Sequence, residues 1–198
     1  HQPTAYSEDR SGGSHPIQQP LENLREAGSL YGGIIYQKAP VVMRQLEALM
    51  GEEAFRKGIQ EYLKTFAYGN ATWDDLVGVL DSYSEEDISG WSLAWVKEPG
   101  MPEIRTEWEI GPDGRLSRLA LVQEKPAPSG RYWIQSTVVA LAYPDTIVHI
   151  PVRLESEVTE VPTAKGLPRP LAVLSNASSM SYGYFQLDSI SLAYGLLR

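Results

Sequence analysis

The spacing of hydrophobic residues changes once along the chain, close to Gly100, and this change limits the folds that the sequence can adopt. Before it, apolar residues recur at helical spacing, as in residues 42–50. After it, apolar and polar residues alternate, as in residues 103–110. We therefore predict an α+β chain of two domains, with an all-α helical bundle segment over residues 1–100 and a small antiparallel β-sandwich over residues 101–198.

Four helices are expected in the first half. Two of them form a pair that is joined at Gly51, because helical spacing stops and restarts at this residue. Thr72 with Asp75 three residues later is a variant of the capping box and predicts the start of the third helix. The fourth is short, carries two tryptophans and ends at Pro99-Gly100, since proline disfavours helical backbone in the residue before it.

The second half is expected to consist of short strands. Residues 104–110 and 119–123 flank the turn sequence GPDG and predict a hairpin. Turns that contain proline and glycine separate the remaining expected strands, at residues 133–143, 146–154, 171–174 and 184–187. Strands at this spacing, with no helical segment between them, are typical of an antiparallel sandwich.

Composition excludes several classes of function. Lys and Arg total 17 against 25 for Asp and Glu, so the net charge is -8, and no basic cluster offsets it. Nucleic acid is therefore not an expected partner, because phosphate binding needs a basic face. No apolar run is long enough for a membrane span, so we expect a soluble chain without a membrane partner, either cytoplasmic or exported. The absence of cysteine excludes disulfides and thiolate metal sites.

The remaining residues do not form a complete catalytic or metal-binding motif. His1, His15 and His149 are the three histidines, and none lies near another in the sequence. No H-E-x-x-H, G-x-S-x-G or glycine-rich phosphate loop occurs. We therefore expect no metal ligands among these residues, and structural or surface roles for the histidines.

Four segments resemble, in order and spacing, the aminopeptidase N family of zinc metallopeptidases. The family pattern has a histidine-proline pair, a Y-x-K-G motif at the start of a helix, a G-E-x-x-F-x-x-G-x-x-x-Y run, a G-N-x-T cap and a tryptophan ahead of G-x-P. The matching segments are SHPI (14–17), IIYQKAPVVMRQLEALMGEEAFRKGIQEYLKTFAYGNATWDDL (34–76), WVKEPGMPEI (95–104) and VLSNASSMSYGYFQLDSISL (173–192). The resemblance implies that residues 1–100 are the helical C-terminal subdomain of a peptidase catalytic domain and that residues 101–198 are the β-sandwich domain after it.

The resemblance also assigns roles to single residues. Tyr36 matches the family's catalytic tyrosine, Lys38 matches the lysine of Y-x-K-G, and Tyr31 matches an aromatic wall of the substrate pocket. Ala39 departs from the family's glycine, and Pro40 after it predicts that the helix starts here with Tyr36 just upstream. A phenol is a dependable hydrogen-bond donor to an oxyanion, typically worth about 3 kcal/mol. Position alone favours a packing role for Tyr36, whereas the resemblance favours the catalytic role.

The resemblance implies a fragment of a zinc-dependent aminopeptidase that hydrolyses N-terminal residues from peptides. Zinc and the peptide substrate would belong to the full-length parent, and the upstream zinc-binding part of the same chain would be the partner of this piece. The piece would bind no zinc and would be inactive alone. One alternative is a non-catalytic scaffold or interaction module derived from a degenerate peptidase, and another is an unrelated adhesion module. An H-E-x-x-H motif upstream of residue 1 would favour the enzyme.

Overall fold

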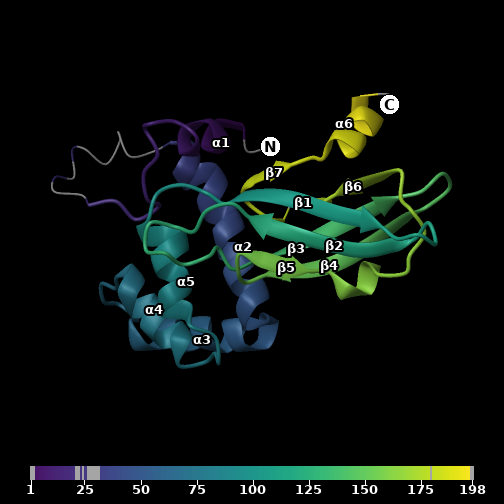
Figure 1. Cartoon of the computed structure of the whole chain (residues 1–198). Helices are drawn as coiled ribbons and strands as arrows, with labels where there is room; N and C mark the ends of the chain where they lie inside the picture. The colour runs from purple at the N-terminus through teal and green to yellow at the C-terminus, as the bar shows by residue number, and fades with distance from the viewer. Residues whose placement is uncertain (1–2, 21–22, 24, 26–31, 179, 197–198) are drawn as a thin grey trace. The chain divides into compact units, whose positions relative to one another are not determined.

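The computed structural model in Figure 1 describes residues 3–20, 23, 25, 32–178 and 180–196. The chain divides into two units, residues 1–100 and residues 101–198. Helices make up the regular structure of the first unit, and strands make up most of that of the second. The mixture of helices and strands confirms the α+β class.

The first unit contains the helices that hydrophobic spacing predicts, together with one that it does not. Gly51 has φ 81° and separates the two paired helices, α2 and α3. Helix α1 was not expected, because its seven residues are too few to show a helical period. The helical segments are α1 (Pro3–Asp9), the π-helix η2 (Ile34–Lys38), α2 (Ala39–Met50), α3 (Glu52–Thr65), α4 (Trp73–Asp81), α5 (Ile88–Ser92) and the π-helix η3 (Leu93–Lys97).

Helix α4 begins with the capping box that the sequence predicts. The Asp75 N–H donates to Thr72 Oγ1 at 3.2 Å, and the Thr72 N–H donates to Asp75 Oδ2 at 2.8 Å. These hydrogen bonds satisfy backbone donors at the helix start that have no intrahelical partner. The Thr72 hydroxyl also donates to Asp75 Oδ2 at 2.7 Å, and this bond, together with the one from the Thr72 N–H, holds the pKa of the Asp75 carboxyl below its usual value.

The core of the first unit lies between the later helices. Trp91 and Trp95 are buried, and their ring centroids are 6.3 Å apart. Leu80 of α4 and Leu46 of α2 are also fully buried. Each of these helices therefore hides an apolar stripe, as their spacing requires. Within the described residues, no helix is both long and apolar enough to span a membrane.

The second unit consists of two sheets. One has the strand order β5-β2-β1-β7 and the other has the order β4-β3-β6. The strands are β1 (Glu103–Ile110), β2 (Leu116–Gln123), β3 (Gln135–Ala142), β4 (Ile147–Leu154), β5 (Val158–Glu160), β6 (Ala172–Leu174) and β7 (Tyr184–Gln186). A 3-10 turn, Pro162–Ala164, follows β5, and helix α6 (Ser189–Leu196) follows β7.

Both sheets contribute side chains to one hydrophobic core. Leu119 and Leu121 of β2, Leu141 of β3 and Leu154 of β4 are almost fully buried in the same cluster. Alternation along β1 agrees with this, because Ile104 is buried whereas the next residue is exposed. The pattern that predicted strands thus arises because one face of each sheet is covered.

The expectation of a wholly antiparallel arrangement was wrong at one edge. β7 pairs with β1 in parallel over Glu103–Arg105, whereas β2 pairs with β1 in antiparallel fashion. Alternation shows which face of a strand is buried but not the direction of its neighbour, and β7 comes from far along the chain. The short strand β5 was also not predicted, since its three residues are mostly exposed.

Candidate functional site

Helix α2 begins at Ala39, so Pro40 lies in its first turn as expected, but Tyr36 just upstream already lies in helical backbone. It belongs to η2, which runs directly into α2, and the Ala39 N–H donates to Ile34 O across the wide turn. An α-helix would direct the N–H of residue 40 to the carbonyl of Tyr36, but proline has none and its ring would crowd that carbonyl. The wider π-turn relieves this conflict.

The Tyr36 side chain is 66% exposed, whereas its neighbours on the same turn are buried or partly buried. Its backbone N–H donates to Gly32 O at 3.1 Å. Ile34 and Lys38 are fully buried and fix two sides of the turn in the unit. The turn therefore presents the phenol outward from an anchored backbone.

Helix α1 holds the start of this turn. The Glu8 carboxylate accepts hydrogen bonds from the N–H groups of Gly33 and Ile34, both at 3.2 Å. A carboxylate is favourable there because the first N–H groups of a helix carry partial positive charge. In the opposite sense, the Ala5 N–H donates to Gln37 Oε1 at 3.2 Å. Residues on both sides of Tyr36 are thus bonded to α1.

Lys38 forms a buried ion pair and is not a surface charge. Its side chain is fully buried and pairs with Asp9 Oδ2 at 3.0 Å. Lys38 Nζ also donates to Gly100 O at 2.6 Å, and Ser14 Oγ donates to Asp9 Oδ1 at 2.9 Å. Burial lowers the pKa of Lys38, and the charge and hydrogen bond of Asp9 oppose part of that effect. The pair joins α1, η2 and the end of the first unit.

Gly33 is required by the close approach of α1. A Cβ at this position would lie 2.8 Å from Ala5 N and 3.0 Å from the carbonyl carbon of Thr4. Because these are backbone atoms, α1 must move to make room. We expect Gly33→Ala to detach α1, although alanine is favoured over glycine in helices by about 1 kcal/mol. Trypsin should then cleave after Arg10 faster than in the unmodified chain.

Gly78→Ala is the matched control for this substitution. Gly78 lies within α4, and a Cβ there would meet nothing within 4 Å. The control should therefore raise the free energy of unfolding by up to about 1 kcal/mol. Unchanged cleavage after Arg10 in Gly33→Ala would show that α1 does not depend on this contact.

Two of the three histidines lie within the described residues. His15 is half-buried, with Nδ1 3.0 Å from Pro16 O, and His149 is exposed on β4. In the part of the chain that the structure describes, no three His, Asp or Glu residues form a group that would hold a metal ion. Tyr31, the predicted wall of the substrate pocket, lies outside the described residues.

Sequence reasoning missed the residues of α1 that hold the turn. Glu8 and Asp9 lie more than 20 residues before Tyr36 in a polar segment without a helical period. The one signal that pointed to this region was the SHPI segment, and its Ser14 is the residue that bonds Asp9. Burial of Lys38 had no sequence signal, because a lysine in a helical pattern usually marks a solvated face.

The chain is similar in sequence to known proteins. Residues 1–95 match the peptidase family M1 domain. The chain is 34% identical over 201 residues to aminopeptidase N of Streptomyces lividans. This alignment covers 96% of this chain and 24% of that protein. It is 33% identical over 121 residues to leucyl aminopeptidase of Saccharolobus solfataricus, covering 61% of this chain and 15% of that protein.

Solved structures show the same fold. Aminopeptidase A of Legionella pneumophila, crystallised with aspartic acid, aligns with a TM-score of 0.60 and 20% sequence identity. The alignment covers 81% of this chain and 18% of that one, so the chain spans about a quarter or less of the proteins named above. The chain belongs to the aminopeptidase N family, peptidase family M1.

Proposed function

We propose that this chain is the part of a zinc-dependent aminopeptidase that follows the zinc-binding segment. Residues 1–100 would be the helical C-terminal subdomain of the catalytic domain, and residues 101–198 would be the β-sandwich domain after it. Similarity to aminopeptidases from a bacterium and an archaeon supports the peptidase assignment. Membership of the family argues against the alternative of an unrelated adhesion module. No observation favours the other alternative, a scaffold without activity.

The chain's own contribution to the reaction would be the Tyr36 hydroxyl. In the parent, this hydroxyl would donate a hydrogen bond to the oxygen that becomes negative when the peptide carbonyl is attacked. The observation that carries this role is the contrast between an exposed phenol and an anchored turn. A donor that is held in position before the reaction stabilises the transition state without the cost of reorganisation.

The family implies zinc, but the described residues do not supply a site for it. They contain no group of three or more His, Asp or Glu that would hold a metal ion. Zinc would therefore be held by the upstream part of the parent, and the peptide substrate would bind between that part and Tyr36. Zinc added to this chain alone should leave its melting temperature unchanged, since only a ligand that binds the native state raises it.

The parent enzyme is expected to hydrolyse aminoacyl p-nitroanilides, which report the release of an N-terminal residue. Treatment with 1,10-phenanthroline should abolish this activity and added zinc should restore it, because the metal activates the attacking water in zinc peptidases. The 198-residue chain alone should give no turnover. A parent without activity on any aminoacyl nitroanilide, or one insensitive to the chelator, would contradict the proposed function.

A further inference from the structure

The four-stranded sheet of the second unit has an open edge along β1. β2 pairs with β1 as far as Ile110, whereas β7 pairs with it only over Glu103–Arg105. In the described part of the chain, no strand follows β7 along this side of β1. Unpaired N–H and C=O groups on such an edge are a template for another strand.

The C=O group of Thr106 and both backbone groups of Trp108 point to this open side. The Tyr184 N–H donates to Pro102 O at 2.9 Å, so the backbone groups of Pro102 face β7. Successive residues of a strand direct these groups to opposite edges. Every second residue after Pro102 therefore faces the same side. The pairing of Arg105 with Gln186 uses the Thr106 N–H, so this side is open from the Thr106 C=O onward.

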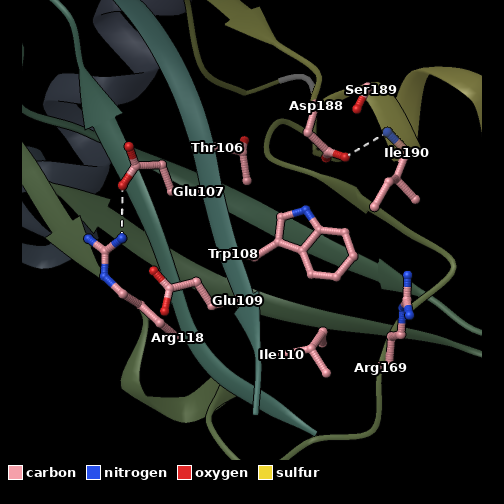
Figure 2. A pocket seen from close by; sticks show the side chains of 10 residues that line it. All are labelled: Thr106, Glu107, Trp108, Glu109, Ile110, Arg118, Arg169, Asp188, Ser189 and Ile190. Atoms are coloured by element: carbon pink, nitrogen blue, oxygen red, sulfur yellow. Dashed lines mark hydrogen bonds and ion pairs between the residues drawn. The ribbon is translucent and has the colours of Figure 1, made fainter. Parts of the chain in front are cut away.

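A cleft of about 590 Å³ lies along the open stretch of β1 (Figure 2). Trp108 and Ile110 from β1 and Ile190 from α6 give it apolar surface. The carboxylate of Asp188 is already occupied, because it accepts hydrogen bonds from the N–H groups of Ile190 and Ser191. The cleft thus offers an apolar floor beside a row of backbone groups.

Thr106 gives a second and independent indication of a missing partner. It lines the cleft, it is only 6% exposed, and its Oγ1 is buried without a hydrogen-bond partner. Buried hydroxyls almost always have a partner, because leaving one unmade costs free energy. A peptide backbone in the cleft would supply this partner.

Two charges of the cleft define the chemistry of its occupant. Glu107 is already paired with Arg118, at 2.8 Å. Glu109 and Arg169 are exposed, and within the described residues neither forms an ion pair. Glu109 lies on the outward face of β1, on the opposite side from Trp108, because side chains alternate along a strand. Arg169 comes from another segment and lies near Ile110 (Figure 2).

We propose that the β1 edge from Thr106 to Ile110 binds an extended peptide segment as an added strand in line with β7. The inward-facing side chains of the bound peptide are apolar where they lie over Trp108 and acidic where they approach Arg169. Its outward-facing side chains are basic opposite Glu109. Main-chain hydrogen bonds give such a complex its affinity, and alternate side chains give it specificity. This site is independent of Tyr36 and of the proposed peptidase activity.

The probe is the peptide acetyl-Lys-Val-Lys-Val-Lys-Glu-Lys-amide, added to the uniformly ¹⁵N-labelled chain of 198 residues. The amide resonance of Trp108 should shift and saturate, and its hydrogen exchange should slow by about tenfold or more as it becomes paired. No saturable shift at Trp108, or shifts confined to other parts of the chain, would overturn the proposal.

The control peptide carries N-methyl groups on its third and fifth residues, both lysines. In β7 the residue opposite Arg105 is Gln186, so residues opposite odd-numbered positions of β1 direct their N–H groups to it. Methylation removes these donors and keeps every side chain, so binding should be lost. Equal binding of the two peptides would mean attraction by charge alone and would overturn strand addition.

Variants of the chain test the charges and the hydroxyl. Glu109→Lys should weaken binding by about threefold to tenfold, whereas Asp145→Lys, the same charge change in an exposed turn, should not. Thr106→Val should weaken binding and raise the melting temperature, because it removes the unpartnered hydroxyl. Concentration-dependent protection of the Trp108 amide without peptide would show that a second copy fills the edge, which would also overturn the proposal.

Discussion

Replacing Lys38 by methionine should lower the free energy of unfolding of the helical unit by about 3–5 kcal/mol. Methionine has similar length and flexibility, so it fills the same space. It removes the cation that pairs with the buried carboxylate of Asp9 and the donor to Gly100 O. A carboxylate left in the interior without its cation is costly because it has lost water and gained no counter-charge. Such a loss is a large fraction of the stability of an ordinary domain.

Circular dichroism at 222 nm during urea unfolding measures this loss, because every α-helix of the described residues except α6 lies in the first unit. Lys57→Met is the matched control, since Lys57 pairs with Glu53 on the surface of α3 with 55% of its side chain exposed. An exposed pair of this kind contributes roughly 0–1 kcal/mol.

A second variant separates the lost charge from lost packing. Adding Asp9→Asn to Lys38→Met removes the unpaired charge and should recover much of the stability. If Lys38→Met alone is as stable as Lys57→Met, the buried pair does not hold α1 against η2.

The parts of the fold that the sequence predicted depend on local patterns. The change of hydrophobic spacing near Gly100, the break at Gly51 and the cap at Thr72 are each visible within a few residues. The structure contains the corresponding features, with α2 and α3 meeting at Gly51 and the capping box at the start of α4. Period and capping chemistry act locally, so they are readable without tertiary information.

The parts that the sequence did not predict depend on contacts between distant segments. Asp9 and Lys38 pair across 29 positions, and neither residue type indicates burial. The parallel pairing of β7 with β1 joins segments about 80 residues apart. The π-turn at Tyr36 is an intermediate case, because Pro40 suggested a boundary but the chain continued through it by widening one turn.

The candidate site was predicted only through a family resemblance. Tyr36 and Lys38 have the same spacing as in the family motif. Neither the hydrophobic spacing nor the charge of this segment distinguishes them from residues that only pack. The structure adds that Lys38 is buried and Tyr36 exposed, although they lie two residues apart on one turn. Lys38 thus has a structural role that the motif alone does not reveal.

Replacing Tyr36 by phenylalanine should lower kcat of the parent enzyme by roughly 10²- to 10³-fold with little change in KM. The hydroxyl would act on the negative oxygen of the transition state and not on the bound substrate, so ground-state binding should be kept. Stability should hardly change, because phenylalanine retains the ring and the side chain is 66% exposed.

Tyr68→Phe is the matched control. Tyr68 is fully exposed beyond the end of α3, and the substitution removes the same hydroxyl from a residue with no assigned role. Its kcat and melting temperature should both equal those of the unmodified enzyme. A similar fall of kcat in both variants would point to a general effect of losing a tyrosine hydroxyl.

The most direct test of the proposed function is kcat of the Tyr36→Phe parent on an aminoacyl p-nitroanilide, measured beside its melting temperature. The account predicts turnover reduced by about two to three orders of magnitude at an unchanged melting temperature. Turnover close to that of the unmodified enzyme would contradict it, because Tyr36 would then be an exposed aromatic on an anchored turn without a part in catalysis.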